Sequence, residues 1–181
     1  MKSIAIIATM TLAALLGHAN AIAKEAPAAT PAMLAARLQR LEDIEAIRLL
    51  LDRYLLLNET RDYPAYSQLF AANGELVLRR GRATGPDAIL KLLNDSFGAA
   101  NAAPNNPLNG SKHLLSNVAI HVDGDTATAS SRWTLLTVGT EQRPALAQTG
   151  HYADKLVREN GVWKFQQRII SRDIPSAAPA N

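Results

Sequence analysis

Two hairpin signals in the second half of the chain constrain the fold more than any other feature. Asp123-Gly124 separates "HLLSNVAIHV" from "TATASSRWTLLTV", and Asn160-Gly161 separates "ALAQTGHYADKLVR" from "VWKFQQRIISRD". Asp-Gly and Asn-Gly favour the tight turns that join neighbouring antiparallel strands. The sequence therefore predicts an antiparallel meander over residues 113–173.

The first half has the periodicity of helices. Apolar residues recur every three to four positions after residue 34, which predicts a long helix ending near residues 58–61. Asp62 is a candidate N-cap for a second helix with Pro64 in its first turn, and we expect "ANG" at 72–74 to end that helix. A third helix is expected between Pro86 and Gly98. Three helices followed by a meander predict an α+β fold, with the helices on one face of a strongly curved, mostly antiparallel sheet.

The ends of the chain differ in composition from its centre. Residues 1–23 contain Lys2, an uncharged apolar run and small residues before Ala21 and Ala23, which is the pattern of a cleaved secretory signal peptide. The run is too short for a membrane span. We expect a signal peptide at 1–23, a flexible leader at 24–33, one domain at 34–173 and a disordered tail at 174–181. The mature protein would be periplasmic or secreted, without membrane contact.

Several classes of function are excluded by composition and motifs. The chain contains no cysteine, which rules out disulfides and thiolate metal sites. Its formal net charge is +3, and the basic residues are too scattered for a nucleic-acid track. No histidine–carboxylate set has zinc-ligand spacing, and neither a Gly-x-Ser-x-Gly elbow nor a phosphate loop is present. We therefore expect chemistry that needs no cofactor.

The strand that begins at residue 113 combines an apolar face with a polar one. Alternate residues of a strand point to the same side, so His113, Leu115 and Asn117 are expected on one face. That face meets either a pocket or solvent. Histidine is the side chain suited to proton transfer near neutral pH, which makes His113 a candidate acid or base if the face lines a pocket.

The order of these elements resembles the SnoaL-like branch of the nuclear transport factor 2-like superfamily, including its scytalone dehydratase-like and bile-acid dehydratase-like members. The residues that carry the resemblance are Ile47-Arg48 and Tyr54, then "GPDAI", "HLLSNVAIHVDGDTA" and "GHYADKLVRENGVWKFQQR". The resemblance spans about residues 40–173 and implies a cone-shaped α+β roll. The family contains small-molecule lyases, isomerases, hydrolases and cyclases, as well as members that only bind.

The resemblance also implies roles for individual residues. His113 matches the histidine that moves a proton in dehydratase-like members, and Tyr54 matches a tyrosine that hydrogen-bonds the substrate oxygen. Those members carry an aspartate five residues after the tyrosine, where this chain has Glu59 beside Asn58. Five residues rotate about 140° around an ideal helix. Either the helix loosens before Glu59, or Glu59 lies on the surface and Asn58 faces the cavity.

Further candidates complete the predicted site. We expect Trp133 in the cavity wall or the core, and His151 either in the pocket or at its rim. The residues expected to bind substrate are Asn117, Asn58, Trp133 and His151, beside the catalytic candidates His113, Tyr54 and Glu59. Asp154 and Arg168 are expected to form a structural pair across the last hairpin.

These predictions lead to one function and one alternative. The chain is expected to be exported, to bind a small, mostly apolar or aromatic molecule, and to act as a cofactor-independent dehydratase or isomerase. The alternative is a non-catalytic binding or oligomerisation module of the same fold. The resemblance implies a homodimer that pairs through the outer face of the sheet, where we expect Trp163, Phe165 and Ile169 on one side.

Overall fold

The computed structural model describes residues 29–98 and 111–173. The expected signal peptide, most of the expected leader and the expected tail therefore lie outside the described residues. Helix α1 begins at Pro31, so the last residues of the expected leader are helical and that boundary is corrected. Residues up to Ala35 form a unit of their own, in which the main-chain N–H of Leu34 donates to the carbonyl of Thr30 at 3.0 Å.

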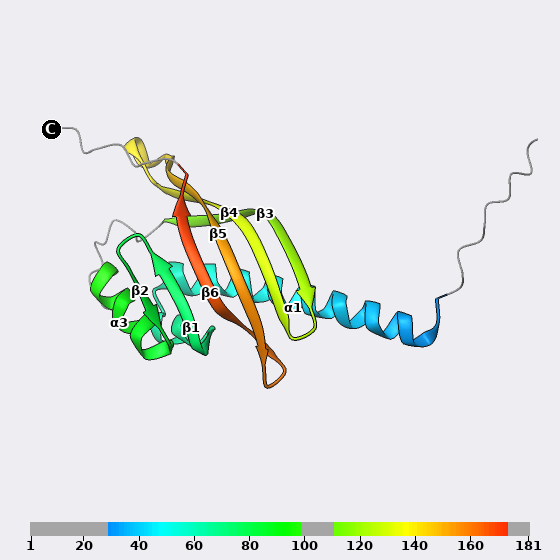
Figure 1. The fold of residues 1–181 in the computed structure, drawn as a ribbon. Helices are drawn as coiled ribbons and strands as arrows, with labels where there is room; N and C mark the ends of the chain where they lie inside the picture. Colours follow the sequence, from blue (N-terminus) through cyan, green and yellow to red (C-terminus); the bar gives the residue numbers. More distant parts are fainter. Residues whose placement is uncertain (1–28, 99–110, 174–181) are drawn as a thin grey trace, which may run out of the picture. The chain divides into compact units, whose positions relative to one another are not determined.

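The larger unit, from Ala36 onward, carries the sheet and the rest of the helices. The helices are α1 (Pro31–Thr60), α2 (Tyr63–Ser67) and α3 (Pro86–Phe97), and the strands are β1 (Phe70–Leu78), β2 (Gly81–Thr84), β3 (Lys112–Asp123), β4 (Thr126–Val138), β5 (Pro144–Glu159) and β6 (Val162–Arg172). The sheet has the order β2-β1-β6-β5-β4-β3 (Figure 1). All neighbours are antiparallel except β1 and β6, which are parallel. The predicted α+β class is confirmed.

Local signals set the ends of the shorter helices. Asp62 caps α2, because its Oδ1 accepts a hydrogen bond from the main-chain N–H of Ala65 at 3.0 Å. Pro86 starts α3, and Gly98, with φ of 83°, follows its last residue. The predicted turns at Asp123-Gly124 and Asn160-Gly161 join β3 to β4 and β5 to β6.

The expectation that "ANG" ends the second helix is wrong. Helix α2 ends at Ser67, and Gly74 lies within β1, where the register with β6 shifts between Phe70 and Glu75. A Cβ added at Gly74 would lie 2.5 Å from the carbonyl oxygen of Phe165. Gly74 therefore permits the close approach of β1 to β6. From sequence alone, a glycine in this role cannot be told from one that ends a helix.

A bulge in β3 overturns the expected alternation of that strand. The register with β4 runs from Ser116↔Arg132 to Ala119↔Ser130, so Asn117 and Val118 together oppose one residue of β4. Asn117 has φ of 51° and is exposed, and Val118 takes the inward position. Because the extra residue reverses the alternation, His113 and Asn117 do not share a face.

The outer face of the sheet also differs from the expectation. Trp163 and Phe165 point inward and are 5% and 0% exposed, whereas Ile169 lies on the other side of β6. The cause is a second irregularity, because Leu156 pairs with Phe165 but Lys155 pairs with Gln167. The expected grouping of the three apolar side chains is wrong, so it no longer supports the predicted homodimer, which stays a prediction.

A buried carboxylate fastens α1 to the last hairpin. Asp43 accepts hydrogen bonds from Trp163 Nε1 at 3.1 Å and from Arg158 Nη2 at 2.8 Å. Burial alone would raise the pKa of Asp43, but its hydrogen bonds and the Arg158 charge bring that pKa below the ordinary value. The carboxylate therefore stays ionised and holds α1 against the β5–β6 hairpin.

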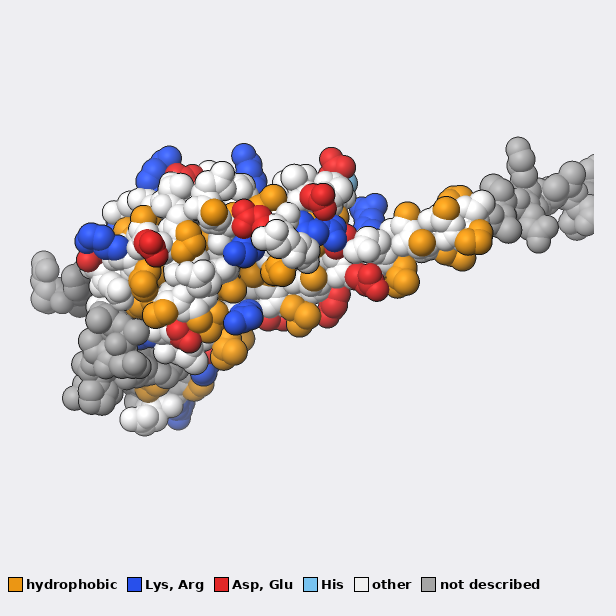
Figure 2. All heavy atoms as spheres, turned by 90° about the horizontal axis from the view of Figure 1, so that it is seen from below, with side chains coloured by type: hydrophobic (Ala, Val, Ile, Leu, Met, Phe, Trp, Pro, Cys, Tyr) orange, Lys and Arg blue, Asp and Glu red, His pale blue; other side chains and the backbone are white. Residues whose placement is uncertain are grey.

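The exposed surface of the larger unit is mixed in character. Figure 2 shows hydrophobic and charged side chains interspersed on the face that it presents. Leu38, Leu41, Leu49 and Leu56 of α1 are each more than half exposed. Of the helices in the described ranges, none has both the length and the apolarity needed to cross a membrane.

Candidate functional site

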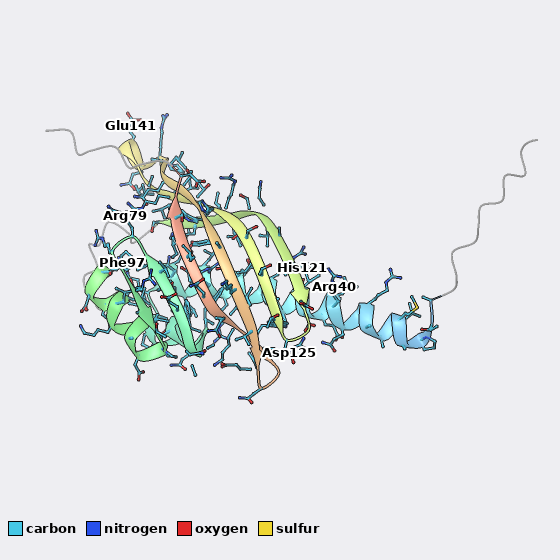
Figure 3. The ribbon with its side chains drawn as sticks, viewed as in Figure 1. Arg40, Arg79, Phe97, His121, Asp125 and Glu141 are labelled. Atoms are coloured by element: carbon cyan, nitrogen blue, oxygen red, sulfur yellow. The ribbon has the colours of Figure 1, made fainter. Side chains whose placement is uncertain are left out.

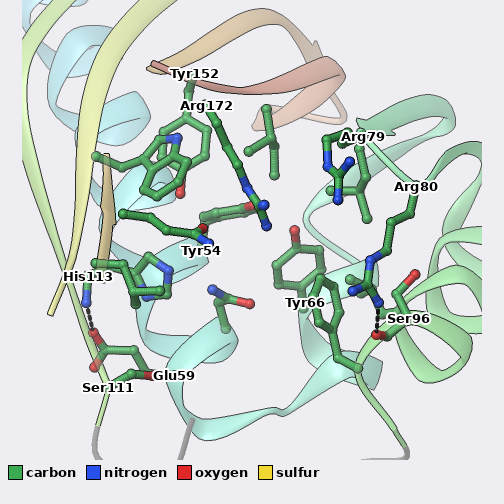
Figure 4. A pocket seen from close by; sticks show the side chains of 18 of the residues that line it. Tyr54, Glu59, Tyr66, Arg79, Arg80, Ser96, Ser111, His113, Tyr152 and Arg172 are labelled. Carbon is green, nitrogen blue, oxygen red and sulfur yellow. Dashed lines mark hydrogen bonds between the residues drawn. The ribbon is translucent and has the colours of Figure 1, made fainter. Parts of the chain in front are cut away.

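A cavity of about 880 Å³ lies between the helices and the inward face of the sheet (Figure 4). Its wall takes residues from the end of α1, from α2 and α3, from the β1–β2 turn, and from β3, β4, β5 and β6. The inward positions of β4 between Ala127 and Trp133 are small or aromatic, with Ala127 and Ala129 in the core and Trp133 at the cavity. A volume of this size accommodates a small organic molecule.

Four buried tyrosines line the cavity, and the rings of three of them, Tyr54, Tyr66 and Tyr152, lie close together. The Tyr54 ring lies 4.7 Å from that of Tyr66 and 5.7 Å from that of Tyr152, measured between centroids. Burial raises the pKa of Tyr54, although the nearby Arg168 charge opposes that shift. It raises the pKa of Tyr66 and Tyr152 well above the ordinary value. All three phenols therefore keep their protons near neutral pH and can donate hydrogen bonds.

A buried ion pair supports these rings. Arg168 is 0% exposed, and its guanidinium carbon lies 3.8 Å from the Tyr54 centroid and 4.1 Å from the Tyr152 centroid. Asp154 accepts two hydrogen bonds from Arg168, at 2.8 and 2.9 Å. The predicted pair is confirmed, and it follows from the register, in which Asp154 is the direct cross-strand partner of Arg168.

His113, the second residue of β3, lines the cavity. Burial lowers the pKa of its imidazole, and the negative charge of Glu59 partly opposes this by raising it. The Nδ1 atom is buried and has no hydrogen-bond partner among the described residues. The ring centroid lies 6.4 Å from that of Trp133. Burial therefore favours the neutral imidazole, and within the described ranges its buried Nδ1 has no hydrogen-bond partner.

Glu59 and Asn58 both line the cavity, so the structure matches neither of the two simple alternatives. The Glu59 carboxylate is not on the surface, since its side chain is 15% exposed. It accepts the main-chain N–H of His113 at 2.7 Å, and its other oxygen lies 3.0 Å from Lys112 Nζ. Helix α1 continues to Thr60, so Glu59 reaches β3 from the last helical turn rather than from a loosened segment.

Trp133 forms part of the wall, as predicted, because its cross-strand partner is a glycine. Gly150 pairs directly with Trp133. A Cβ added at Gly150 would lie 2.5 Å from two atoms of the indole and would also overlap the carbonyl oxygen of Ser171. The absence of a side chain at residue 150 thus leaves the space that the indole occupies. Trp133 Nε1 is buried without a hydrogen-bond partner in the described part of the chain.

Two of the predicted binding residues lie away from the cavity. Asn117 is exposed at the β3 bulge. His151 is on the outer face of β5, where its Nδ1 lies 2.6 Å from Asp173, which also pairs with Arg132 at 2.7 Å. The structure thus brings together Tyr54, Asn58, Glu59, His113 and Trp133, and it places Asn117 and His151 outside.

The fold and the cavity can be compared with those of known proteins. A sequence profile of the SnoaL-like domain matches residues 39–169. The chain belongs to the SnoaL-like family. A search of curated proteins finds no match of significance.

Several solved structures have the same fold. The chain is similar to an NTF2-like protein with a cystatin-like fold from Novosphingobium aromaticivorans, with a TM-score of 0.68 and 27% identity over 82% of this chain and 93% of that one. It is also similar to a putative scytalone dehydratase from the same organism, with a TM-score of 0.61 and 23% identity over 78% and 91% of the two chains. ActVI-ORFA from Streptomyces coelicolor has a TM-score of 0.60 and 20% identity, over 72% and 96%.

The cavity of this SnoaL-like protein also contains arginines that the sequence analysis missed. Arg79 and Arg80 come from the turn between β1 and β2, Arg61 follows α1, and Arg172 ends β6. In the sequence, Arg79 and Arg80 are the two adjacent arginines of "LRRGR", which indicates a turn. A turn does not indicate which surface its side chains face. Tyr152 was also missed, although it shares the inward face of β5 with Asp154.

The described residues contain no group of three or more histidine, aspartate or glutamate side chains placed to hold a metal ion. The groups that the cavity does offer include one imidazole, protonated phenols, an indole, a carboxylate and arginines. Such a set can take a proton from a bound molecule and donate hydrogen bonds to its oxygen atoms.

Proposed function

We propose that this SnoaL-like protein binds a small, mostly apolar molecule in its cavity and catalyses a cofactor-independent proton transfer that leads to dehydration or isomerisation. The observation that carries the proposal is the placement of His113. Its imidazole lines the cavity, burial lowers its pKa, and its Nδ1 has no partner among the described residues. A neutral, partly buried imidazole that faces a cavity is suited to act as a general base.

The tyrosines supply the complementary donors. A base that removes a proton next to a carbonyl or hydroxyl needs a group that stabilises charge on the oxygen. Tyr54 lines the same cavity as His113 and keeps its proton because burial raises its pKa. We assign it the role of hydrogen-bond donor to the substrate oxygen. Asn58, four residues on and therefore on the same side of α1, provides a second polar contact.

A second candidate function rests on the position of Glu59. In a histidine–carboxylate pair the carboxylate contacts the imidazole, yet Glu59 accepts the main-chain N–H of His113 instead. No described carboxylate hydrogen-bonds the imidazole. A cavity with an unassisted histidine also fits a module that binds a small molecule without converting it. The two candidates differ in whether the protein accelerates proton removal.

Deuterium exchange tests this difference without knowledge of the natural substrate. The probe is 2-tetralone, a bicyclic ketone with exchangeable protons next to its carbonyl, followed by NMR in D₂O with the full mature chain. We expect the protein to accelerate exchange, and His113→Gln to lose about 10²- to 10⁴-fold of that acceleration. His121→Gln is the matched control, because His121 is exposed near the β3–β4 turn, away from Arg79 and Phe97 at the cavity end (Figure 3).

The two candidates give different results. Binding of 2-tetralone, seen as a change in tryptophan fluorescence, without exchange above that of His113→Gln would reject the enzyme and favour the binding module. Equal loss of exchange in His113→Gln and His121→Gln would show that His113 has no special role.

Export and pairing belong to the same proposal. The signal-peptide pattern of residues 1–23 supports a periplasmic or secreted location. Recovery of protein that begins after Ala21 or Ala23 from the cell envelope would agree with export, and intact Met1 in the cytosol would contradict it. Homodimer formation is tested by light scattering at micromolar concentration, where a mass of one chain would reject it.

A further inference from the structure

The arginines of the cavity outnumber its carboxylates. Arg61, Arg79, Arg80 and Arg172 line the wall, and Glu59 is the one acidic residue among the described residues that line it. The Glu59 carboxylate lies 3.0 Å from Lys112 Nζ, so its charge is already compensated from outside this set. The charged side chains that line the cavity therefore carry a net positive charge.

The arginines retain free hydrogen-bond donors. Arg80 Nη1 donates to the carbonyl of Ser96 at 3.0 Å, and Arg61 Nη1 donates to the carbonyl of Phe97 at 3.3 Å. Arg61 is only 7% exposed, yet its Nη2 is buried without a partner among the described residues. Within the described ranges, none of the four arginines forms an ion pair with a carboxylate. A buried donor without a partner, such as Arg61 Nη2, is costly unless a ligand satisfies it. Arg79 and Arg172 are exposed at the opening, so their guanidinium groups are accessible to a bound anion.

The positive groups and His113 occupy different sides of the cavity. Arg79 and Arg80 belong to the β1–β2 edge of the sheet, whereas His113 belongs to β3 at the opposite edge. Figure 4 shows His113 and Glu59 on one side, Arg79 and Arg80 on the other, and the Arg172 side chain extending into the space between them. A molecule that spans the cavity thus meets the imidazole at one end and guanidinium groups at the other.

We propose that the natural ligand is an aromatic or fused-ring carboxylic acid, whose carboxylate is held by Arg79 and Arg172 while its ring system lies against the apolar wall. This inference rests on the proposed function and names the substrate class of the same cavity. The planar guanidinium matches a carboxylate with two parallel hydrogen bonds, which gives both affinity and orientation. The acid group anchors the molecule at the β1–β2 edge, and the reacting carbon is then presented to His113.

A pair of isosteric probes tests the inference directly. The probes are 2-naphthoate and the neutral 2-naphthamide, titrated into the mature protein with calorimetry or tryptophan fluorescence as the readout. We expect 2-naphthoate to bind at least about tenfold more tightly, since a charge-assisted bidentate pair is much stronger than a neutral hydrogen bond. The preference is expected to weaken as salt is raised, because the arginines at the opening are exposed.

Variants assign the preference to particular arginines. Arg79→Gln and Arg172→Gln should each reduce the acid-to-amide affinity ratio several-fold, and the double variant should bring it close to one. Arg53→Gln is the matched control, because it removes the same single charge from a residue that is exposed on α1 and does not line the cavity. An unchanged ratio in the double variant would overturn the assignment to these two residues.

The outcomes separate this inference from the proposed function. If 2-naphthamide binds as tightly as 2-naphthoate, the carboxylate inference fails and small-molecule binding survives. If neither probe binds and 2-tetralone does not bind, both fail. Tighter binding of 2-naphthyl phosphate than of 2-naphthoate would overturn the carboxylate as the class of anion.

Discussion

The carboxylate of Glu59 accepts a hydrogen bond from the main-chain N–H of His113 at 2.7 Å, which ties the last turn of α1 to the first residues of β3. This contact holds the backbone of the candidate base and leaves its imidazole free of a carboxylate partner. Glu59 therefore acts on His113 through position and charge. The two effects can be separated by substitution.

Replacement of Glu59 by glutamine should lower the pKa of His113. The Glu59 charge raises that pKa against the effect of burial, so its removal leaves burial unopposed. The amide oxygen of glutamine can still accept the main-chain N–H, and the fold should be kept. NMR titration of the His113 ring protons measures the shift. A His113 pKa that rises, or does not move, would contradict the assigned effect of the charge.

Glu59→Ala should also cost stability, because it removes the acceptor itself. Loss of a hydrogen bond to a charged, mostly buried group lowers the free energy of unfolding by about 1.5–3 kcal/mol. Urea unfolding of the alanine and glutamine variants side by side separates the hydrogen bond from the charge. Equal stability of Glu59→Ala and the parent chain would show that the contact contributes nothing to the fold.

The titration of His113 should make the protein less stable in mild acid. Burial places the folded-state pKa of His113 below the value of the unfolded chain. The unfolded state then binds more protons between those two values, so stability falls as pH decreases from the unfolded pKa of about 6.5 towards the folded pKa. Urea unfolding at pH 7.5 and pH 5.5 should show a smaller difference for His113→Gln than for the parent. A larger stability difference between the two pH values in His113→Gln than in the parent would contradict the predicted direction of the pH dependence.

The sequence was informative where local rules determine the structure. Asp62 and Pro64 specified the start of α2, and Asn160-Gly161 specified the last turn, because each works through its own backbone and near neighbours. The pairing of Asp154 with Arg168 was also expected, but the turn alone would place Asp154 opposite Gln167, and the register shift between Lys155 and Leu156 brings Arg168 opposite it. The fold class could be predicted from these signals taken together.

The errors in β3 and β6 share one physical cause, which is that bulges depend on tertiary contacts. One extra residue at Asn117 reverses the alternation of β3, and the shift beside Gln167 does the same in β6. Neither position has a sequence pattern strong enough to predict a bulge. The arginines of the cavity were missed for a related reason, since the side of the sheet that a turn such as Arg79-Arg80 faces is decided by the helices packed beside it.

Gly150→Ala should displace Trp133 from the cavity wall. The added methyl would lie within 2.5 Å of the indole and against the carbonyl of Ser171, so either the ring or the β5–β6 pairing must move. Overpacking of this kind costs about 1–3 kcal/mol of folding free energy. Urea unfolding and the tryptophan emission maximum report both effects.

Ala153→Val is the matched control for that experiment. Ala153 lies on the same strand but is exposed on the other face, so a larger side chain there meets no indole. The control should leave both stability and emission nearly unchanged. If Gly150→Ala behaves like the control, the glycine is not what makes room for Trp133.

Removal of one member of the Asp154–Arg168 pair should be among the most damaging single changes in the protein. Both side chains are 0% exposed, and two hydrogen bonds of 2.8 and 2.9 Å join them. Arg168→Met leaves a buried carboxylate without a counter-charge and also removes the cation from the faces of Tyr54 and Tyr152. We expect a loss of about 3–5 kcal/mol in the free energy of unfolding.

The double variant Asp154→Leu/Arg168→Met distinguishes a buried charge from lost packing. With neither charge present, no uncompensated group remains. The double variant should therefore lose much less free energy of unfolding than the sum of the losses in the two single variants. A double-mutant cycle from urea unfolding gives the coupling energy, for which we expect about 1.5 kcal/mol or more. Additive losses would show that the two side chains stabilise the fold independently, and that the cation under the tyrosines matters through its bulk rather than its charge.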